Sequence, residues 1–192
     1  MDAVVFSSQT FLFYFLPLVL LLYAAVPRSR RNLALLVPSL IFYVWGAGGL
    51  VGILLLSIAG NWWVGRALGR GANARVCVTA SLVLNGAILG YFKYANFFFD
   101  QVNAAGARVF GFGGFEVAAV ALPIGISFYT FQATSYVIDV ARGRTQPVSE
   151  FVDFALYVAS FPQLIAGPIV RFHEVAPQLR SRPFDWGHVS SG

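Results

Sequence analysis

Long apolar runs, separated by short polar or arginine-rich stretches, fill most of the chain. An apolar run of about 20 residues matches the hydrocarbon thickness of a bilayer, so such runs predict membrane-spanning helices. The predicted spans cover about residues 6–26, 32–45, 50–64, 76–92 and 117–141, followed by a re-entrant segment at 148–170. We therefore expect an all-α fold, a polytopic transmembrane helical bundle that contains broken or re-entrant helices.

The stretch Tyr157–His173 begins as an apolar helix and is broken by Pro162 and again by Gly167–Pro168. Proline removes a backbone donor and clashes with the preceding turn, so regular helix cannot run through both sites. Lipid cannot satisfy free backbone groups, so broken backbone at membrane depth lies within protein or beside a cavity. The segment is therefore predicted to be re-entrant and to return Arg171 to the cytoplasmic side.

The composition supports a membrane protein. Hydrophobic residues make up 58% of the chain and charged residues only 11%, whereas soluble domains carry about 25% charged residues. The net charge of +5 is interpreted as a topology signal, because no basic stretch interleaves with a polar surface, and nucleic-acid binding is therefore not expected. Cys77 is the only cysteine, which excludes a disulfide framework and a cysteine-based metal site. We expect no bound metal or cofactor.

Two arginine clusters, at residues 28–31 and 66–75, orient the predicted helices. Cytoplasmic loops carry the excess of lysine and arginine, and two crossings separate the clusters, so both are predicted to lie inside. This orientation places the N-terminus outside and makes the turn Gly46–Gly49 the external tip of a hairpin. The segment Asn61–Trp63, near the inner end of the third run, is interpreted as an interfacial anchor.

The run at 117–141 contains Pro123 near its start, so regular helix is expected only from Ser127 to Val140. Asp139 lies near the end of this helix. Arg142 follows three residues later, a spacing that allows an ion pair. Two interpretations of this pair stay open: an exposed surface pair, or part of the lining of a site.

No signature of a soluble enzyme is present, neither a nucleophile elbow nor a P-loop, a zinc-binding HExxH or a dinucleotide-binding motif. The polar residues beside the broken backbone are therefore the site candidates, since polar groups inside a membrane are costly and mark functional sites. Gln163 and Arg171 are predicted to line a site, and His173 is a further candidate. The alternative for His173 is an ordinary solvated or hydrogen-bonded histidine on a surface element.

Three segments carry a resemblance to a known family: VVFSSQTFLFYFLPLVLLLY at 4–23, LPIGISFYTFQATSYVIDV at 122–140 and ASFPQLIAGPIVRF at 159–172. Together they resemble the bacterial membrane-bound O-acyltransferase family, over essentially all 192 residues. The last two motifs are specific enough to outweigh general hydrophobic similarity.

The resemblance implies a single domain with many helices and a funnel toward the membrane centre, of which residues 1–192 form the N-terminal part. The chain is accordingly expected to be truncated. The histidine that serves the family is expected beyond residue 192, so the resemblance implies no catalytic residue here, and this part alone is expected to be inactive. Gln163, Arg171 and His173 would then line the funnel for the acetyl donor.

The resemblance also implies an activity, the transfer of acetyl groups from acetyl-CoA or a derived donor toward hydroxyls of an exported polysaccharide, with alginate as the expected polymer. It implies acetylation partner proteins in the membrane or periplasm, contact with membrane lipid, and a multi-pass location in the bacterial inner membrane with a periplasmic N-terminus. The alternative is a non-enzymatic membrane scaffold or a transporter fragment, because transporters also contain broken helices at the membrane midplane.

Overall fold

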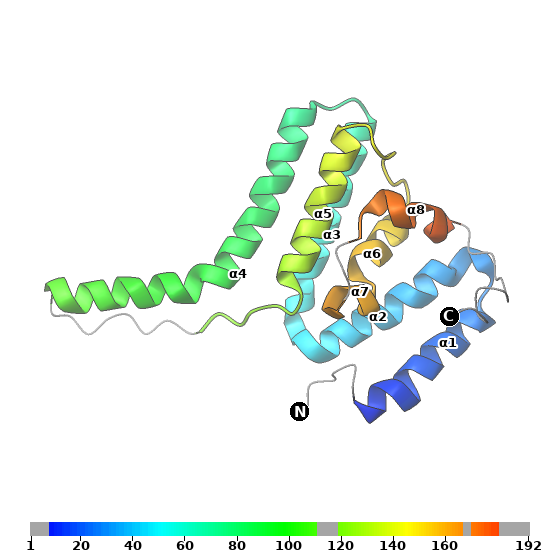
Figure 1. The fold of residues 1–192 in the computed structure, drawn as a ribbon, viewed down its shortest axis with the longest axis horizontal. Helices are drawn as coiled ribbons and strands as arrows, with labels where there is room; N and C mark the ends of the chain where they lie inside the picture. The colour runs from blue at the N-terminus through cyan, green and yellow to red at the C-terminus, as the bar shows by residue number, and fades with distance from the viewer. Residues whose placement is uncertain (1–7, 111–118, 167–169, 181–192) are drawn as a thin grey trace.

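The computed structural model of the chain describes residues 8–110, 119–166 and 170–180 (Figure 1). All regular elements within these ranges are helices, which confirms the predicted all-α class for them. In chain order they are the π-helix η1 (Phe11–Phe15), α1 (Leu16–Ala25), the 3-10 turn η2 (Arg28–Arg30), α2 (Arg31–Ala47), the 3-10 turn η3 (Gly48–Leu50), α3 (Val51–Gly69), α4 (Ala74–Phe110), α5 (Ile126–Ala141), α6 (Phe151–Ala159), α7 (Phe161–Ala166) and α8 (Phe172–Arg180). The first predicted span, 6–26, corresponds to η1 and α1, apart from residues 6 and 7, which lie outside the described ranges.

The centre of the bundle consists of α3, α5 and the first half of α4, which lie side by side (Figure 1). Helix α2 packs against α6, and α1 lies along α2. Aromatic side chains fill the space between α5, α6 and α8. The Tyr136 ring centroid lies 4.6 Å from that of Phe154 and 5.3 Å from that of Phe172. Aromatic pairs at such distances stabilise a core by about 0.5–1.5 kcal/mol each beyond the burial of their area.

Helices α2 and α3 form a hairpin that turns at η3. Both are longer than predicted. Helix α2 has 17 residues, whereas a span at 32–45 was expected, and α3 has 19 residues, whereas a span at 50–64 was expected. The helical stretches Arg28–Gly69, which holds this hairpin, and Ala74–Arg108 are the two in the described ranges that are long and apolar enough to cross a membrane. That these or the other helices cross a membrane stays a prediction.

Helix α4 differs most from the prediction. A span was expected at 76–92, but one helix of 37 residues continues to Phe110. It bends near its middle, and its second half extends away from the bundle (Figure 1). Gly86 and Gly90 lie in this middle part, and glycine is a common residue at helix kinks.

The segment before α5 is held to α4 by Asn96. The Asn96 side chain donates a hydrogen bond to the Val120 carbonyl oxygen at 2.9 Å and accepts one from the Val120 N–H at 2.8 Å. Regular helix then begins at Ile126, so the helix expected from Ser127 to Val140 is confirmed. The run at 117–141 is therefore not a single continuous helix, because the chain around Pro123 is not helical.

Gly125 allows α5 and α7 to approach closely. Its φ of 71° lies in the left-handed region, which glycine adopts more readily than other residues. A Cβ atom at this position would lie 2.7 Å from the carbonyl oxygen of Leu164 in α7. The sequence places glycine here because both the backbone conformation and the space require it.

The predicted break in the last apolar helix is confirmed. Helix α6 ends at Ala159 and α7 begins at Phe161, while Ser160 between them has a non-helical ψ of 120°. The backbone N–H of Phe161 donates to the Ser39 hydroxyl of α2 at 3.3 Å. The second predicted break, at Gly167–Pro168, lies outside the described ranges, and re-entry of the segment stays a prediction.

Candidate functional site

Asp139 is the centre of a charged cluster at the C-terminal end of α5. Its side chain is only 5% exposed, and two arginine side chains and one histidine side chain surround its carboxylate. Nη1 of Arg144 lies 3.8 Å from Asp139 Oδ1, and Nη1 of Arg171 lies 3.9 Å from the same oxygen. Nδ1 of His173 lies 3.6 Å from Oδ2, and this pair is ionic only when the histidine is protonated. The negative charge is buried, whereas both arginine side chains are 51% exposed.

The turn that ends α5 places Arg144 beside Asp139. The N–H of Arg144 donates to the Asp139 carbonyl oxygen at 2.9 Å, and the N–H of Gly143 donates to that of Val140 at 3.0 Å. These two bonds, with a φ of 70° at Gly143, form the Schellman arrangement that commonly ends helices. The arrangement turns Arg144 back over the last turn of α5, toward the Asp139 carboxylate.

The buried ring of Phe172 positions Arg171 and His173. It packs 5.3 Å from the Tyr136 ring and 5.1 Å from the Tyr157 ring, at the start of α8. Because Phe172 faces the core, its two neighbours are left at the surface beside Asp139. The Tyr157 hydroxyl donates to the Val170 carbonyl oxygen at 2.9 Å, which ties the approach to α8 onto α6.

Helix α6 is in turn fixed to α5 by a buried hydrogen bond. Nε2 of Gln132 donates to the Tyr157 carbonyl oxygen at 2.7 Å. This carbonyl belongs to the last turn of α6, and Ser160 interrupts the helix directly after that turn. The side chain of Gln132 in α5 therefore satisfies a backbone carbonyl that the break leaves without a helical partner. The broken segment is therefore bonded to the same helix that carries Asp139.

The exposed side of the cluster has the features of an anion-binding site, and the cluster lacks those of an assembled catalytic dyad. The contacts between Asp139 and these three side chains are 3.6–3.9 Å, longer than hydrogen bonds. The exposed guanidinium groups therefore keep N–H donors that can bind an oxygen of a ligand. A pocket of about 390 Å³ lies beside them, lined by Arg144, Thr145, Gln146, Phe172, His173, Ala176 and Pro177. No group of three or more potential metal ligands occurs in the described part of the chain.

Two of the three predicted site residues meet in this cluster. Arg171 and His173 both contact Asp139, whereas Gln163 lies in α7, away from the cluster. The residue after Gln163 contacts Gly125 at the start of α5, while Asp139 lies about 20 Å further along this helix. Nε2 of Gln163 is buried and has no hydrogen-bond partner among the described residues. A role for any of the three residues in binding a ligand stays a prediction.

Asp139 does not pair with the residue suggested by helical spacing. Arg142 lies three residues on, but Asp139 pairs with Arg144 and Arg171 instead. Arg142 is exposed at the helix end, where its N–H completes the last helical hydrogen bond to Ile138. Of the two interpretations left open, the exposed surface pair is wrong, since Asp139 is buried.

A buried polar network between α3 and α4 was not expected from the sequence. Asn61 was interpreted as part of an interfacial anchor, but it is fully buried and bonds to Asn85. Ser57 and Ser81 complete the network, so each helix contributes a serine and, four residues later, an asparagine. Side-chain hydrogen bonds of this kind join helices inside membranes. The repeated S-x-x-x-N spacing was the sequence signal.

The two arginine clusters lie at the same end of the bundle, as their assignment to one side of a membrane requires. Near the first cluster, Nδ2 of Asn32 donates to Asp153 Oδ1 at 2.8 Å. Near the second, Nη1 of Arg66 donates to the Ser149 carbonyl oxygen at 2.9 Å. Residue 149 precedes α6, and residue 153 lies in its first turn. The start of α2 and the end of α3 therefore meet at the N-terminal end of α6.

Comparison with known proteins gives several relatives. The chain is 46% identical to the probable alginate O-acetylase AlgI of Azotobacter vinelandii over 93% of its length, and 45% identical to that of Pseudomonas aeruginosa over 93%. It is 31% identical to the peptidoglycan O-acetyltransferase of Helicobacter pylori over 92%. The chain spans only 36%, 35% and 39% of these proteins, respectively.

No family model matches the chain, and no solved structure is significantly similar to it. The curated relatives nevertheless match nearly the whole chain, and their names all describe O-acetylation. They confirm the resemblance that the three sequence segments indicated. Over the part of the protein that it spans, the chain belongs to this bacterial O-acyltransferase family.

Proposed function

We propose that the natural protein containing this chain is an inner-membrane O-acetyltransferase that transfers acetyl groups toward hydroxyls of an exported polysaccharide. The Asp139 cluster lies on the path by which the acetyl donor, acetyl-CoA or a derivative of it, reaches the reaction centre. The catalytic base is supplied by a part of the protein outside residues 1–192.

The observation that carries this proposal is the meeting of the two most specific motif segments at one site. Asp139 belongs to the segment 122–140 and Arg171 to the segment 159–172, yet their side chains lie 3.9 Å apart. Gln132 of the first segment also bonds to the backbone of Tyr157, two residues before the second. The residues by which the chain resembles acyltransferases are therefore assembled into one surface beside a pocket.

The chemistry of acetyl transfer suits a site with exposed arginines such as the Asp139 cluster. The hydroxyl oxygen of the acceptor forms an ester bond to the acetyl carbon, the C–S bond of a thioester donor breaks, and the hydroxyl proton passes through a base to the leaving thiol. Activated donors carry anionic groups, and arginine binds such groups through paired N–H donors. The pocket beside Arg144 and His173, of about 390 Å³, has the volume of a small-ligand site.

Charge and hydropathy support the proposed membrane placement. The arginine-rich end of the bundle, which includes Arg144 and Arg171, faces the cytoplasm, where acetyl donors are made. The hairpin turn at η3 and the N-terminus then face the periplasm, and the chain crosses the inner membrane several times. Partner proteins in the membrane or periplasm complete the transfer to the polymer. Alginate is the proposed polymer because relatives of 45–46% identity are named alginate O-acetylases.

Complementation tests the proposal. A strain that lacks polymer acetylation is supplied with the natural gene product that contains these residues, either unchanged or carrying Arg171→Ala. We expect the unchanged protein to restore acetylation and the variant to restore less than about a tenth of it, since one charge-assisted hydrogen bond contributes on the order of 1.5–3 kcal/mol. The readouts are ester-linked acetyl per sugar in the exported polymer and the amount of protein in the membrane.

Arg142→Ala is the matched control, because Arg142 is an exposed arginine at the C-terminal end of α5 and forms no ion pair with an acidic residue in the described part of the chain. It should leave acetylation unchanged. If Arg171→Ala acetylates the polymer normally, Arg171 is not part of the site. If the unchanged protein restores transport of a solute but no acetylation, the protein is a transporter and not an acetyltransferase.

A further inference from the structure

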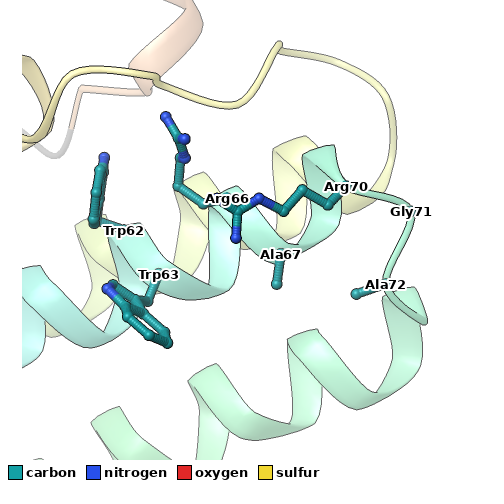
Figure 2. Close-up of a pocket in the computed structure, with 7 residues that line it drawn as sticks. All are labelled: Trp62, Trp63, Arg66, Ala67, Arg70, Gly71 and Ala72. Carbon is teal, nitrogen blue, oxygen red and sulfur yellow. The ribbon is translucent and has the colours of Figure 1, made fainter.

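A second pocket lies where α3 ends and the chain turns into α4. Its volume is about 520 Å³, and it is lined by Trp62, Trp63, Arg66, Ala67, Arg70, Gly71 and Ala72. Both tryptophans and Arg66 come from α3, and Arg70 directly follows its last residue, Gly69. The Arg70 side chain runs back along this helix toward Arg66 (Figure 2). A smaller pocket of about 310 Å³ shares both arginines and adds Gln146 and Ser149 to its lining.

The two arginines are not neutralised. Neither Arg66 nor Arg70 forms an ion pair with any acidic residue in the described ranges, and neither pocket has a carboxylate in its lining. Arg66 is held in place, because its Nη1 donates to the Ser149 carbonyl oxygen at 2.9 Å and its guanidinium lies 5.4 Å from the centre of the Trp62 ring. A positioned pair of arginines without an acidic partner favours an anionic ligand.

The tryptophans indicate the depth of this pocket in a membrane. Trp63 is 73% exposed, although it lies near the end of a helical stretch apolar enough to cross a bilayer. Trp62 instead packs edge-on against Phe151, with ring centroids 5.5 Å apart. Exposed tryptophan beside arginine at a helix end is typical of the headgroup level, where the abundant anions are phosphate esters.

We propose that Arg66 and Arg70, with Trp62 and Trp63, form a binding site for a phosphate ester group at the membrane surface. The two guanidinium groups bind the phosphate oxygens, and the indole ring of Trp63 contacts the apolar part of the ligand. The ligand is either the headgroup of an anionic phospholipid or a soluble phosphate ester from the cytoplasm.

This site is separate from the Asp139 cluster. The pocket of Trp62, Trp63 and the two arginines shares no lining residue with the pocket beside His173. The inference goes beyond the proposed acetyl transfer and does not depend on it, because the measurement below reads binding alone. It would hold equally for a membrane protein without acetyltransferase activity.

The test uses the natural gene product, purified in detergent and depleted of lipid. Native mass spectrometry counts bound phosphatidylglycerol, and equilibrium dialysis measures bound glycerol 3-phosphate, for the unchanged protein and for R66Q/R70Q. We expect phosphate-ester binding to fall about thirtyfold in the variant, since each basic residue near an anionic group contributes roughly a factor of five. R75Q/R142Q removes the same charge from exposed arginines that line neither pocket, and it should bind normally.

Phosphatidylglycerol binding that is lost only in R66Q/R70Q supports the site and identifies a lipid as its ligand. Glycerol 3-phosphate binding that is lost only in that variant supports the site and identifies a soluble ester. If neither probe distinguishes R66Q/R70Q from R75Q/R142Q, the proposal is overturned. R70Q alone repeats the comparison if the double variant unfolds, because Arg70 is exposed and forms no side-chain bond in the described structure.

Discussion

The side-chain amides of Asn61 and Asn85 hydrogen-bond to each other in both directions across α3 and α4. Nδ2 of Asn61 lies 3.2 Å from Asn85 Oδ1, and Nδ2 of Asn85 lies 2.9 Å from Asn61 Oδ1. Ser57 and Ser81 each donate to the asparagine oxygen of the opposite helix, at 2.8 and 2.5 Å. The arrangement is self-complementary, so every polar group in this apolar contact has a partner from the other helix.

Replacing either asparagine should therefore leave a partner unsatisfied. We expect Asn61→Leu and Asn85→Leu each to lower the free energy of unfolding by about 1–2 kcal/mol, the usual range for an interhelical hydrogen bond in a membrane protein. The double variant should lose clearly less than the sum, because its second substitution removes a group that is already unpaired. Thermal unfolding in detergent measures these losses, and Thr79→Leu, on an exposed face of α4, should cause none. Additive losses would contradict the direct pairing.

Two glycines with the same backbone conformation should respond differently to alanine. Gly125 and Gly143 have φ values of 71° and 70°, so each substitution carries the same backbone strain, about 1 kcal/mol. A Cβ at Gly125 would also meet the Leu164 carbonyl oxygen at 2.7 Å, whereas a Cβ at Gly143 meets nothing within 4 Å. The shift in unfolding temperature should therefore be at least twice as large for Gly125→Ala as for Gly143→Ala. Equal shifts would show that α5 and α7 do not pack at this point.

The sequence was a good guide to which runs are helical, because apolar composition and length determine helix formation in this chain. It was a poor guide to helix ends. A span was predicted at 76–92, yet the helix continues to Phe110. A bend near the middle changes the direction of α4 without ending it (Figure 1).

The candidate site was predictable in part. The broken backbone indicated Arg171 and His173, and both lie at Asp139. Arg142, the partner suggested by spacing, does not pair with Asp139. Gly143 ends α5 in a Schellman arrangement that brings Arg144 over Asp139 instead. The glycine was visible in the sequence, but contacts across α5, α6 and α8 depend on tertiary packing, which local spacing does not contain.

Arg144 and Arg171 should substitute for each other in stabilising Asp139. Both contact Oδ1, at 3.8 and 3.9 Å, so either one can balance the buried carboxylate. We expect Arg144→Ala and Arg171→Ala each to lower the free energy of unfolding by less than about 1 kcal/mol, because the arginines are half exposed to solvent. The double variant should lose more than the sum, since it leaves Asp139 with only His173.

A double-mutant cycle of chemical unfolding in detergent measures this coupling. Adding Asp139→Asn to the double variant is the control, because it removes the carboxylate that needs a cation, and it should recover part of the lost stability. An additive cycle would show that the arginines do not share the carboxylate.

The orientation of the bundle can be tested at two glycine-containing turns. Gly48 lies in the turn between α2 and α3, and Gly71 lies in the turn between α3 and α4, so one helix separates them. The arginines around Gly71 predict that its turn is cytoplasmic, and the uncharged turn at Gly48 is then periplasmic. A Cβ at either glycine meets nothing within 4 Å, so both turns have room for an insertion. Alkaline phosphatase, which is active only in the periplasm, should be active when fused at Gly48 and inactive at Gly71, and green fluorescent protein should report the reverse. The same result at both positions would show that α3 does not cross the membrane. If the two results were exchanged, the proposed orientation would be inverted, and the Asp139 cluster would lie on the periplasmic side.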